Sequence, residues 1–310
     1  MTKNLTIKKP VIIIGCPRSG TSLLFTILST SRYLWSLYRE SNDIWENFYN
    51  LTGKEFKNEV LTSEDLNEEV KNLLLNEFHK YSFNNYYLGY FVREYLQKNS
   101  LLKTLLTQAN FLYKHSTLEE YRLVEKTPKN CFRISFMNKL FDDCKFVFLK
   151  RDGRSNINSL LEGWKLKGKY IRMKNPSITL SIKGYEGNGW NFVMPPDWEN
   201  YTNRSLEEVC AFQWVSSNKA AIEGLKLIDE RRKHIVSYEE LSSTPYETVK
   251  KLCDFIGIPF SKELRKISYK PPEVNYVSKP KQDKWKKNAP LIEKVYPQIE
   301  PVMKELGYLP

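Results

Sequence analysis

Residues 10–24 read Pro-Val-Ile-Ile-Ile-Gly-Cys-Pro-Arg-Ser-Gly-Thr-Ser-Leu-Leu. The apolar run at the start predicts a buried strand, and the residues after Gly20 predict a helix that Ser19 caps and that runs to about Thr30. The spacing of Gly15 and Gly20 matches a P-loop, in which backbone N–H groups and a helix N-terminus converge on phosphate oxygens. The stretch therefore predicts a phosphate-binding strand, loop and helix.

This loop lacks the lysine of a nucleoside-triphosphate P-loop. Such a loop places Lys and then Ser or Thr after its second glycine, whereas this chain places Thr21 there. The cation lies inside the loop instead, as Arg18, whose guanidinium can bind a phosphate or sulfonate through two parallel hydrogen bonds. The substitution counts against ordinary ATP or GTP hydrolysis, and a P-loop kinase or NTPase is kept as the alternative prediction.

Composition predicts a folded protein with anionic partners. The chain has 310 residues, of which 41% are hydrophobic and 14% aromatic, so it can bury one sizeable core and is not of disordered composition. Its formal net charge of +12 favours anionic partners, although composition cannot rank them. No RNA-binding aromatic motif and no helix-turn-helix pattern is present, so nucleic acid is not expected as a partner.

Cysteine usage predicts a reducing compartment. The five cysteines contain no C-x-x-C pair, so neither a metal site nor a disulfide framework is indicated. They are Cys16, Cys131, Cys144, Cys210 and Cys253. Residues 1–10 lack the apolar core of a signal peptide, and no run of about 18 apolar residues occurs. We therefore expect a cytoplasmic protein without a transmembrane segment.

Strand and helix patterns alternate along the chain, which predicts an α/β fold with a P-loop-like parallel sheet flanked by helices. Further strands are expected from Leu123, at 145–150 and at 235–236, with helices at 131–141, 153–161 and 206–226. Residues 1–310 are expected to form a single domain. It would carry a helical insertion at about 45–120 and a lid-like loop at about 163–203.

Polar residues follow the predicted strands. Ligands of parallel sheets bind outside the carboxyl ends of the strands, so these residues should converge on one crevice. They are Arg18 to Ser22, Lys126, Arg151 and Tyr238. Arg151 at a strand end and Ser159 on the next helix could together bind a second phosphate.

These motifs, in this order, resemble the sulfotransferases that depend on 3′-phosphoadenosine-5′-phosphosulfate (PAPS). In that family the segment matched by 16–22 holds the 5′-phosphosulfate, and an Arg and a Ser matched by Arg151 and Ser159 hold the 3′-phosphate. The stretches 125–129, Glu-Lys-Thr-Pro-Lys, and 150–154, Lys-Arg-Asp-Gly-Arg, are most similar to the tyrosylprotein sulfotransferase-like and bacterial branch. The resemblance covers about 10–40, 122–165 and 205–286.

The resemblance implies a role for each site residue. Cofactor contacts are implied for Arg18, Ser19, Gly20, Thr21, Ser22, Arg151, Ser159 and Tyr238. Some relatives carry a second arginine where this chain has Gly163, so we expect another cation, Lys279, to complete the 3′-phosphate clamp. Arg18 would bind phosphate or sulfonate oxygens, Lys126 would offset charge on the leaving oxygen, and Glu40 would take the proton of the acceptor hydroxyl. Asp43 and Glu46 compete with Glu40 for that role, and a surface salt bridge with Glu125 is the alternative for Lys126. No metal is required.

The acceptor would be a hydroxyl of a carbohydrate, small metabolite, lipid or peptide, attacked in line, with PAP (adenosine 3′,5′-bisphosphate) as the other product. The predicted lid is basic, because it carries several cations and no carboxylate between Gly163 and Gly184. They are Lys165, Lys167, Lys169, Arg172, Lys174 and Lys183. An acidic acceptor would suit such a segment, and a solvated basic loop is the alternative.

Overall fold

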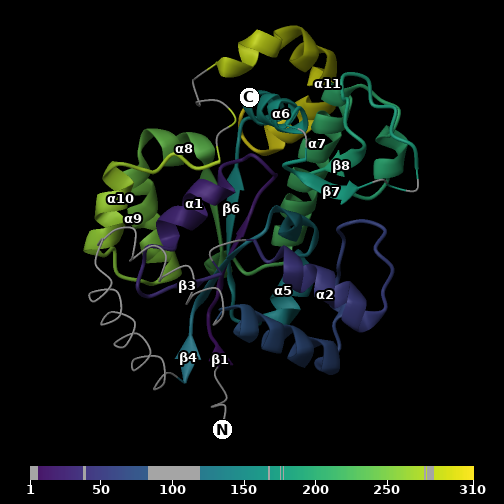
Figure 1. The fold of residues 1–310 in the computed structure, drawn as a ribbon. Coiled ribbons are helices and arrows are strands. Elements are labelled where there is room, and N and C mark those ends of the chain that lie inside the picture. Colours follow the sequence, from purple (N-terminus) through teal and green to yellow (C-terminus); the bar gives the residue numbers. More distant parts are fainter. Residues whose placement is uncertain are drawn as a thin grey trace, which may run out of the picture.

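The structure is a computed structural model that describes residues 6–37, 40–82, 119–166, 168–174, 176, 178–275, 277 and 283–310. At its centre lies a five-stranded sheet with the strand order β3-β5-β2-β6-β9 (Figure 1), in which every neighbouring pair is parallel. The strands are β2 (Val11–Ile14), β3 (Trp35–Ser36), β5 (Leu123–Lys126), β6 (Lys145–Lys150) and β9 (Lys233–Ser237). The predicted α/β fold with a parallel sheet is confirmed.

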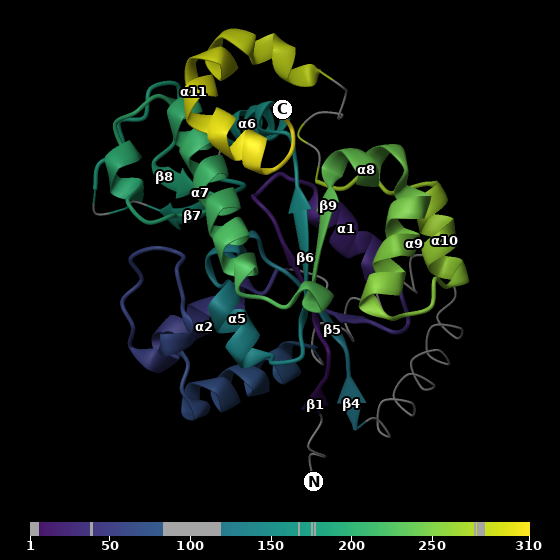
Figure 2. The ribbon, with the colours of Figure 1, turned by 180° about the vertical axis from the view of Figure 1, so that it is seen from behind.

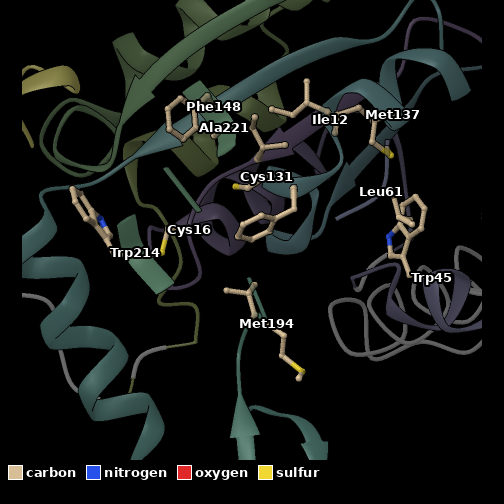
Figure 3. Packing of buried hydrophobic residues seen from close by; sticks show 14 of the residues in the cluster. Ile12, Cys16, Trp45, Leu61, Cys131, Met137, Phe148, Met194, Trp214 and Ala221 are labelled. Atoms are coloured by element: carbon tan, nitrogen blue, oxygen red, sulfur yellow. The ribbon is translucent and has the colours of Figure 1, made fainter. Parts of the chain in front are cut away.

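Strand β2 shows why the sheet needs helices on both faces. Its residues are fully buried, and successive side chains of a strand point to opposite faces. Ile12 and Ile14 therefore join one apolar cluster, part of which Figure 3 shows around Phe148, whereas Val11 and Ile13 join another. An uninterrupted apolar run is thus what a central parallel strand requires.

Helices cover the two faces, as Figures 1 and 2 show from opposite sides. One face carries α1 (Thr21–Leu28), α8 (Tyr238–Ser243), α9 (Pro245–Ile256) and α10 (Lys262–Tyr269). The other carries α2 (Asn42–Thr52), α5 (Ile134–Leu140), α6 (Gly153–Trp164), α7 (Leu206–Lys226) and α11 (Ala289–Glu305). Helix α7 coincides with its predicted range, since Ser205 and Glu208 form a capping box at its start.

Short elements complete the described fold. Parallel β1 (Thr6–Ile7) and β4 (Glu120–Tyr121) pair with each other, as do antiparallel β7 (Ile171–Lys174) and β8 (Gly189–Asn191). Single 3₁₀ turns lie at Ser63–Asp65, Pro128–Phe132, Trp198–Tyr201, Glu230–Arg232 and Lys284–Asn288. Residues 68–82 are helical. The helical insertion expected at about 45–120 stays a prediction, because its residues 83–118 lie outside the described part of the chain.

Three local predictions need correction. The helix after the loop ends at Leu28 rather than near Thr30, and its N-cap is Gly20 rather than Ser19. The segment 163–203 is not a plain loop, because it contains β7, β8 and a 3₁₀ turn and buries Trp190 and Trp198 in the core. Its role as a lid, like the single-domain organisation, stays a prediction.

All five cysteines are free and buried. Burial raises the pKa of each thiol, which keeps the sulfur protonated and unreactive. Over the described ranges, no helix is both long and apolar enough to cross a membrane. Nor do those residues bring together three or more side chains that could ligate a metal.

Candidate functional site

The carboxyl ends of the parallel strands meet at one edge of the sheet, where two pockets lie side by side. The first pocket is lined by Arg18, Thr21, Ser22, Arg151, Ser159 and Tyr238, among others. The second pocket is lined by Arg18, Glu40, Asn42, Lys129, Tyr170 and Arg172, among others. Arg18, Thr21 and Ser22 line both pockets, so the predicted phosphate loop forms the boundary between them.

The loop has a close-packed backbone that requires glycine. Gly20 has φ of 102°, and a Cβ there would lie 2.4 Å from a ring carbon of Tyr238. A Cβ on Gly15 would lie 2.6 Å from the carbonyl oxygen of Leu149. The Oγ of Ser19 is buried and has no hydrogen-bond partner among the described residues. Ser19 therefore does not cap α1, and it lines neither pocket, so its predicted contact with the cofactor stays a prediction.

Arg18 extends from the loop across the boundary between the pockets. Its Nε donates to Ser159 Oγ at 3.2 Å, and its two terminal nitrogens donate to Tyr170 Oη at 3.0 Å and to the carbonyl oxygen of Asn275 at 2.9 Å. Ser159 therefore bonds to Arg18 here, although the sequence paired it with Arg151. Both arginines nevertheless line the first pocket.

Arg151 is held rigidly at the end of β6. Its Nη1 donates to the carbonyl oxygen of Arg18 at 2.8 Å, and its guanidinium lies 4.2 Å from the centre of the Tyr238 ring. Burial lowers the pKa of this guanidinium. The Nε of Arg151 is buried without a hydrogen-bond partner in the described structure. A buried N–H donor without an acceptor destabilises the folded state, and a bound anion would remove that cost.

Lys126 and Glu40 form an ion pair beside the loop. Lys126 Nζ lies 2.5 Å from Glu40 Oε1 and 3.2 Å from Ser22 Oγ, and its side chain is only 5% exposed. The alternative partner Glu125 faces away from it, because this buried carboxylate accepts hydrogen bonds from Ser41, Thr127 and Asn130. Burial raises the pKa of Glu125.

Glu40 is also the predicted base that faces a pocket. Its Oε2 accepts a hydrogen bond from Asn42 Nδ2 at 3.1 Å, and the residue lines the second pocket. Its competitors Asp43 and Glu46 line neither of the two pockets, and the Glu46 side chain is 61% exposed. The geometry therefore favours Glu40 over both.

The structure brings nearly all the predicted site residues to this edge of the sheet. Lys279 lies outside the described residues, so its predicted part in the phosphate clamp stays untested. Sequence reasoning missed several residues that line the pockets, notably Asn158, Asn275, Lys284, Trp285, Asn42 and Lys129. Lys129 had a signal, since it ends the quoted motif at 125–129, whereas the others carry none in a single sequence.

Comparison with known proteins decides the family, because the model of the sulfotransferase family matches residues 10–262. The chain belongs to the sulfotransferase family. As a member, this sulfotransferase is an enzyme that transfers a sulfonate group, which confirms the predicted family and activity. Membership in the tyrosylprotein-like branch stays a prediction.

Solved structures similar to this sulfotransferase include three further sulfotransferases. One from Mycobacterium avium is 14% identical and has a TM-score of 0.49, with 96% of this chain and 77% of that chain covered. One from Alicyclobacillus acidocaldarius is 11% identical, with a TM-score of 0.47 and coverage of 95% and 97%. A mouse sulfotransferase complexed with PAP is 10% identical, with a TM-score of 0.45 and coverage of 97% and 90%. No curated protein matches the sequence.

Proposed function

We propose that this sulfotransferase moves the sulfonate group of PAPS, held in the first pocket, to a hydroxyl group held in the second. The observation that carries the proposal is the junction of the two pockets. Arg18, Thr21 and Ser22 line both of them, and the Lys126–Glu40 pair lies directly beside Ser22. A donor and an acceptor bound in adjoining pockets would meet at this point.

The residues of the first pocket fit a bisphosphorylated nucleotide. Arg18, Arg151 and Lys284 supply positive charge, and the unpartnered Nε of Arg151 supports a hydrogen bond to a phosphate oxygen. The N-terminus of α1 opens at Gly20, where backbone N–H groups favour an anion. Tyr238 offers a ring face beside these cations, next to which the family resemblance places adenine.

Bound PAPS supplies a sulfonate group attached to a phosphate that can depart as PAP. Glu40 would take the acceptor's hydroxyl proton as the new oxygen–sulfur bond forms. Lys126 would offset the negative charge that the leaving phosphate keeps with the electron pair of the broken bond. Arg18 would hold the oxygens of the transferred group between the two pockets.

Two measurements test this proposal. Calorimetric titration with PAP and with ATP plus Mg²⁺ distinguishes a sulfotransferase site from a kinase or NTPase site, and we expect PAP to bind and ATP–Mg²⁺ to bind far more weakly. Incubation with radiolabelled PAPS and a panel of sugars, phenols, lipids and hydroxy acids should then label at least one acceptor. Tight ATP–Mg²⁺ binding without PAP binding would overturn the proposal.

We propose a cytoplasmic location for the enzyme. The support comes from the cysteines, which are all free. Thiols that stay unpaired fit a reducing compartment.

A further inference from the structure

The wall of the second pocket combines cations with aromatic rings. Lys129, Lys169 and Arg172 line it, and so do Tyr170 and Phe192, whose rings stack at 4.8 Å between centres with an interplanar angle of 23°. Lys169 and Arg172 come from the basic segment singled out in the sequence. The pocket thus offers positive charge next to a flat apolar surface.

Lys129 is the unusual member of this wall. The residue is only 7% exposed, yet its Nζ donates to the neutral amide oxygen of Asn42 at 2.7 Å. No carboxylate of the described residues lies within ion-pair distance of it, whereas the neighbouring Lys126 has Glu40. A buried ammonium group without a nearby anion costs desolvation free energy that nothing repays.

The carboxylates near Lys129 form their ion pairs with other cations. Glu59 is fully buried and serves two arginines at once, since Arg133 and Arg172 each lie 2.7 Å from one of its oxygens. Glu46 lies 3.8 Å from Arg172 but is mostly exposed to solvent. Positive charge therefore exceeds negative charge on this side of the pocket, as it would in a site completed by an anionic ligand.

We propose that Lys129 and Arg172 form a subsite for an anionic group on the acceptor, which makes the acceptor a hydroxy acid. The inference rests on the proposed function, because the second pocket receives the acceptor only if the first receives PAPS. Asn42 sets the spacing, since its amide nitrogen bonds to Glu40 and its amide oxygen bonds to Lys129. Glu40, which would bind the acceptor's hydroxyl, and Lys129, which would bind its anionic group, are thus separated by the single amide group of Asn42.

The aromatic wall defines the rest of the acceptor. The stacked Tyr170 and Phe192 continue into Ile171 and Val193, which also line the pocket. An aromatic or aliphatic body would pack there, while its charged end meets Lys129 and its hydroxyl meets Glu40. A carboxylate and a phosphate monoester share the required charge, so the test must distinguish them.

The test measures acceptor binding to the protein loaded with PAP. The probes are 4-hydroxyphenylacetate, its uncharged methyl ester and 4-hydroxyphenyl phosphate, together with 3-hydroxydecanoate and its methyl ester, each titrated calorimetrically. We expect the acids to bind at least about tenfold more tightly than their esters, because a charged hydrogen bond is lost in the ester. In Lys129→Met, which removes the ammonium and leaves a side chain only one atom shorter, most of this preference should be lost, and the remainder would come from Arg172. The phosphate probe shows whether the site prefers phosphate to carboxylate.

The control is Lys250→Met, which removes an exposed lysine on α9. This variant should keep the preference for acids, and both variants should keep the affinity for PAP. Equal binding of acids and esters to the native protein, or no binding of any probe, would overturn the inference. A loss of PAP affinity in Lys129→Met would overturn it too, because Lys129 would then belong to the donor pocket. Failure of the native protein to bind PAP would instead contradict the proposed function.

Discussion

Glu40 and Lys126 show how a pair of opposite charges can serve transfer chemistry. The carboxylate faces the second pocket while the ammonium contacts the loop through Ser22. Each group therefore holds its partner in place and still has an edge directed toward a different substrate.

Glu40→Gln should lower kcat by roughly a hundredfold to ten-thousandfold, because the amide cannot accept the hydroxyl proton. PAP affinity should be unchanged, since Glu40 does not line the first pocket. Steady-state kinetics and calorimetry check both statements. Glu46→Gln is the matched control and should keep its turnover. Full turnover by Glu40→Gln would show that another group is the base.

Arg18→Ala and Arg151→Ala should each weaken PAP binding by about tenfold to a hundredfold, because each removes a charge-assisted hydrogen-bond donor from the first pocket. Calorimetric titration with PAP measures the loss. Arg231→Ala, which removes an arginine side chain that is 89% exposed, serves as the control. If Arg18→Ala and Arg151→Ala both bound PAP as tightly as the native protein does, the sulfonate donor would bind outside the first pocket.

Lys129 gives the acceptor site a pH dependence. Burial is the main cause that lowers the pKa of Lys129 to about 8, and the charged groups facing it are Glu59, Arg172, Arg133 and Glu40. Above this pKa the ammonium loses its proton and no longer attracts an anion. The affinity for 4-hydroxyphenylacetate should thus fall between about pH 7 and about pH 9, while that for the methyl ester stays level. Equal slopes for both probes would contradict this.

Sequence reasoning reached the residues that end apolar strands or directly follow them. Lys126, Arg151 and Tyr238 could be placed together because parallel strands must end at one edge. Lys129 and Asn42 could not be placed, because their approach depends on how a 3₁₀ turn meets the start of α2. Such a contact is set by tertiary packing, which no local spacing encodes.

At the level of elements, the loop and helix α1 depend on one glycine. Gly20 caps the helix with a positive φ and packs its Cα directly beneath Tyr238. The sequence favoured Ser19 as the cap, because serine is preferred at N-caps generally. The structure places the cap at Gly20, where the close approach of Tyr238, a residue more than 200 positions away, leaves no room for a side chain.

Gly20→Ala should lower the free energy of unfolding by about 1–3 kcal/mol and weaken PAP binding, since the added methyl is both strained and too close to Tyr238. Gly53→Ala is the matched control. Gly53 also has a positive φ, of 65°, but a Cβ there meets nothing within 4 Å. Gly53→Ala should lower the free energy of unfolding only by the strain of alanine at a positive φ, and it should keep its PAP affinity. Urea unfolding and calorimetry measure the two quantities, and equal PAP binding by both variants would contradict the expectation.

In the whole molecule, both apolar clusters are fixed by the same central strand, and the pockets lie where that strand ends. A ligand in the first pocket therefore binds segments from both faces of the sheet. These include α6, which packs with one cluster, and α8, which packs with the other. A bound ligand should therefore stabilise the packing on both faces of the sheet together.

PAP at a hundredfold excess over its dissociation constant should raise the free energy of unfolding by about 2.7 kcal/mol and the melting temperature by several degrees. The same concentration should raise the free energy of unfolding of Arg151→Ala by only about 0.4–1.4 kcal/mol, given its tenfold to hundredfold weaker binding. Thermal unfolding followed by circular dichroism measures the shift. An equal rise in both proteins would place PAP outside the pocket that contains Arg151.

Arg18 ties three remote stretches of chain to the loop, through Ser159, Tyr170 and Asn275. Tyr170 also forms part of the wall that an acceptor would touch. Reshaping that wall to admit a different alcohol would release one of the three anchors of the guanidinium. During the evolution of this enzyme, acceptor specificity and nucleotide binding would therefore have to change together.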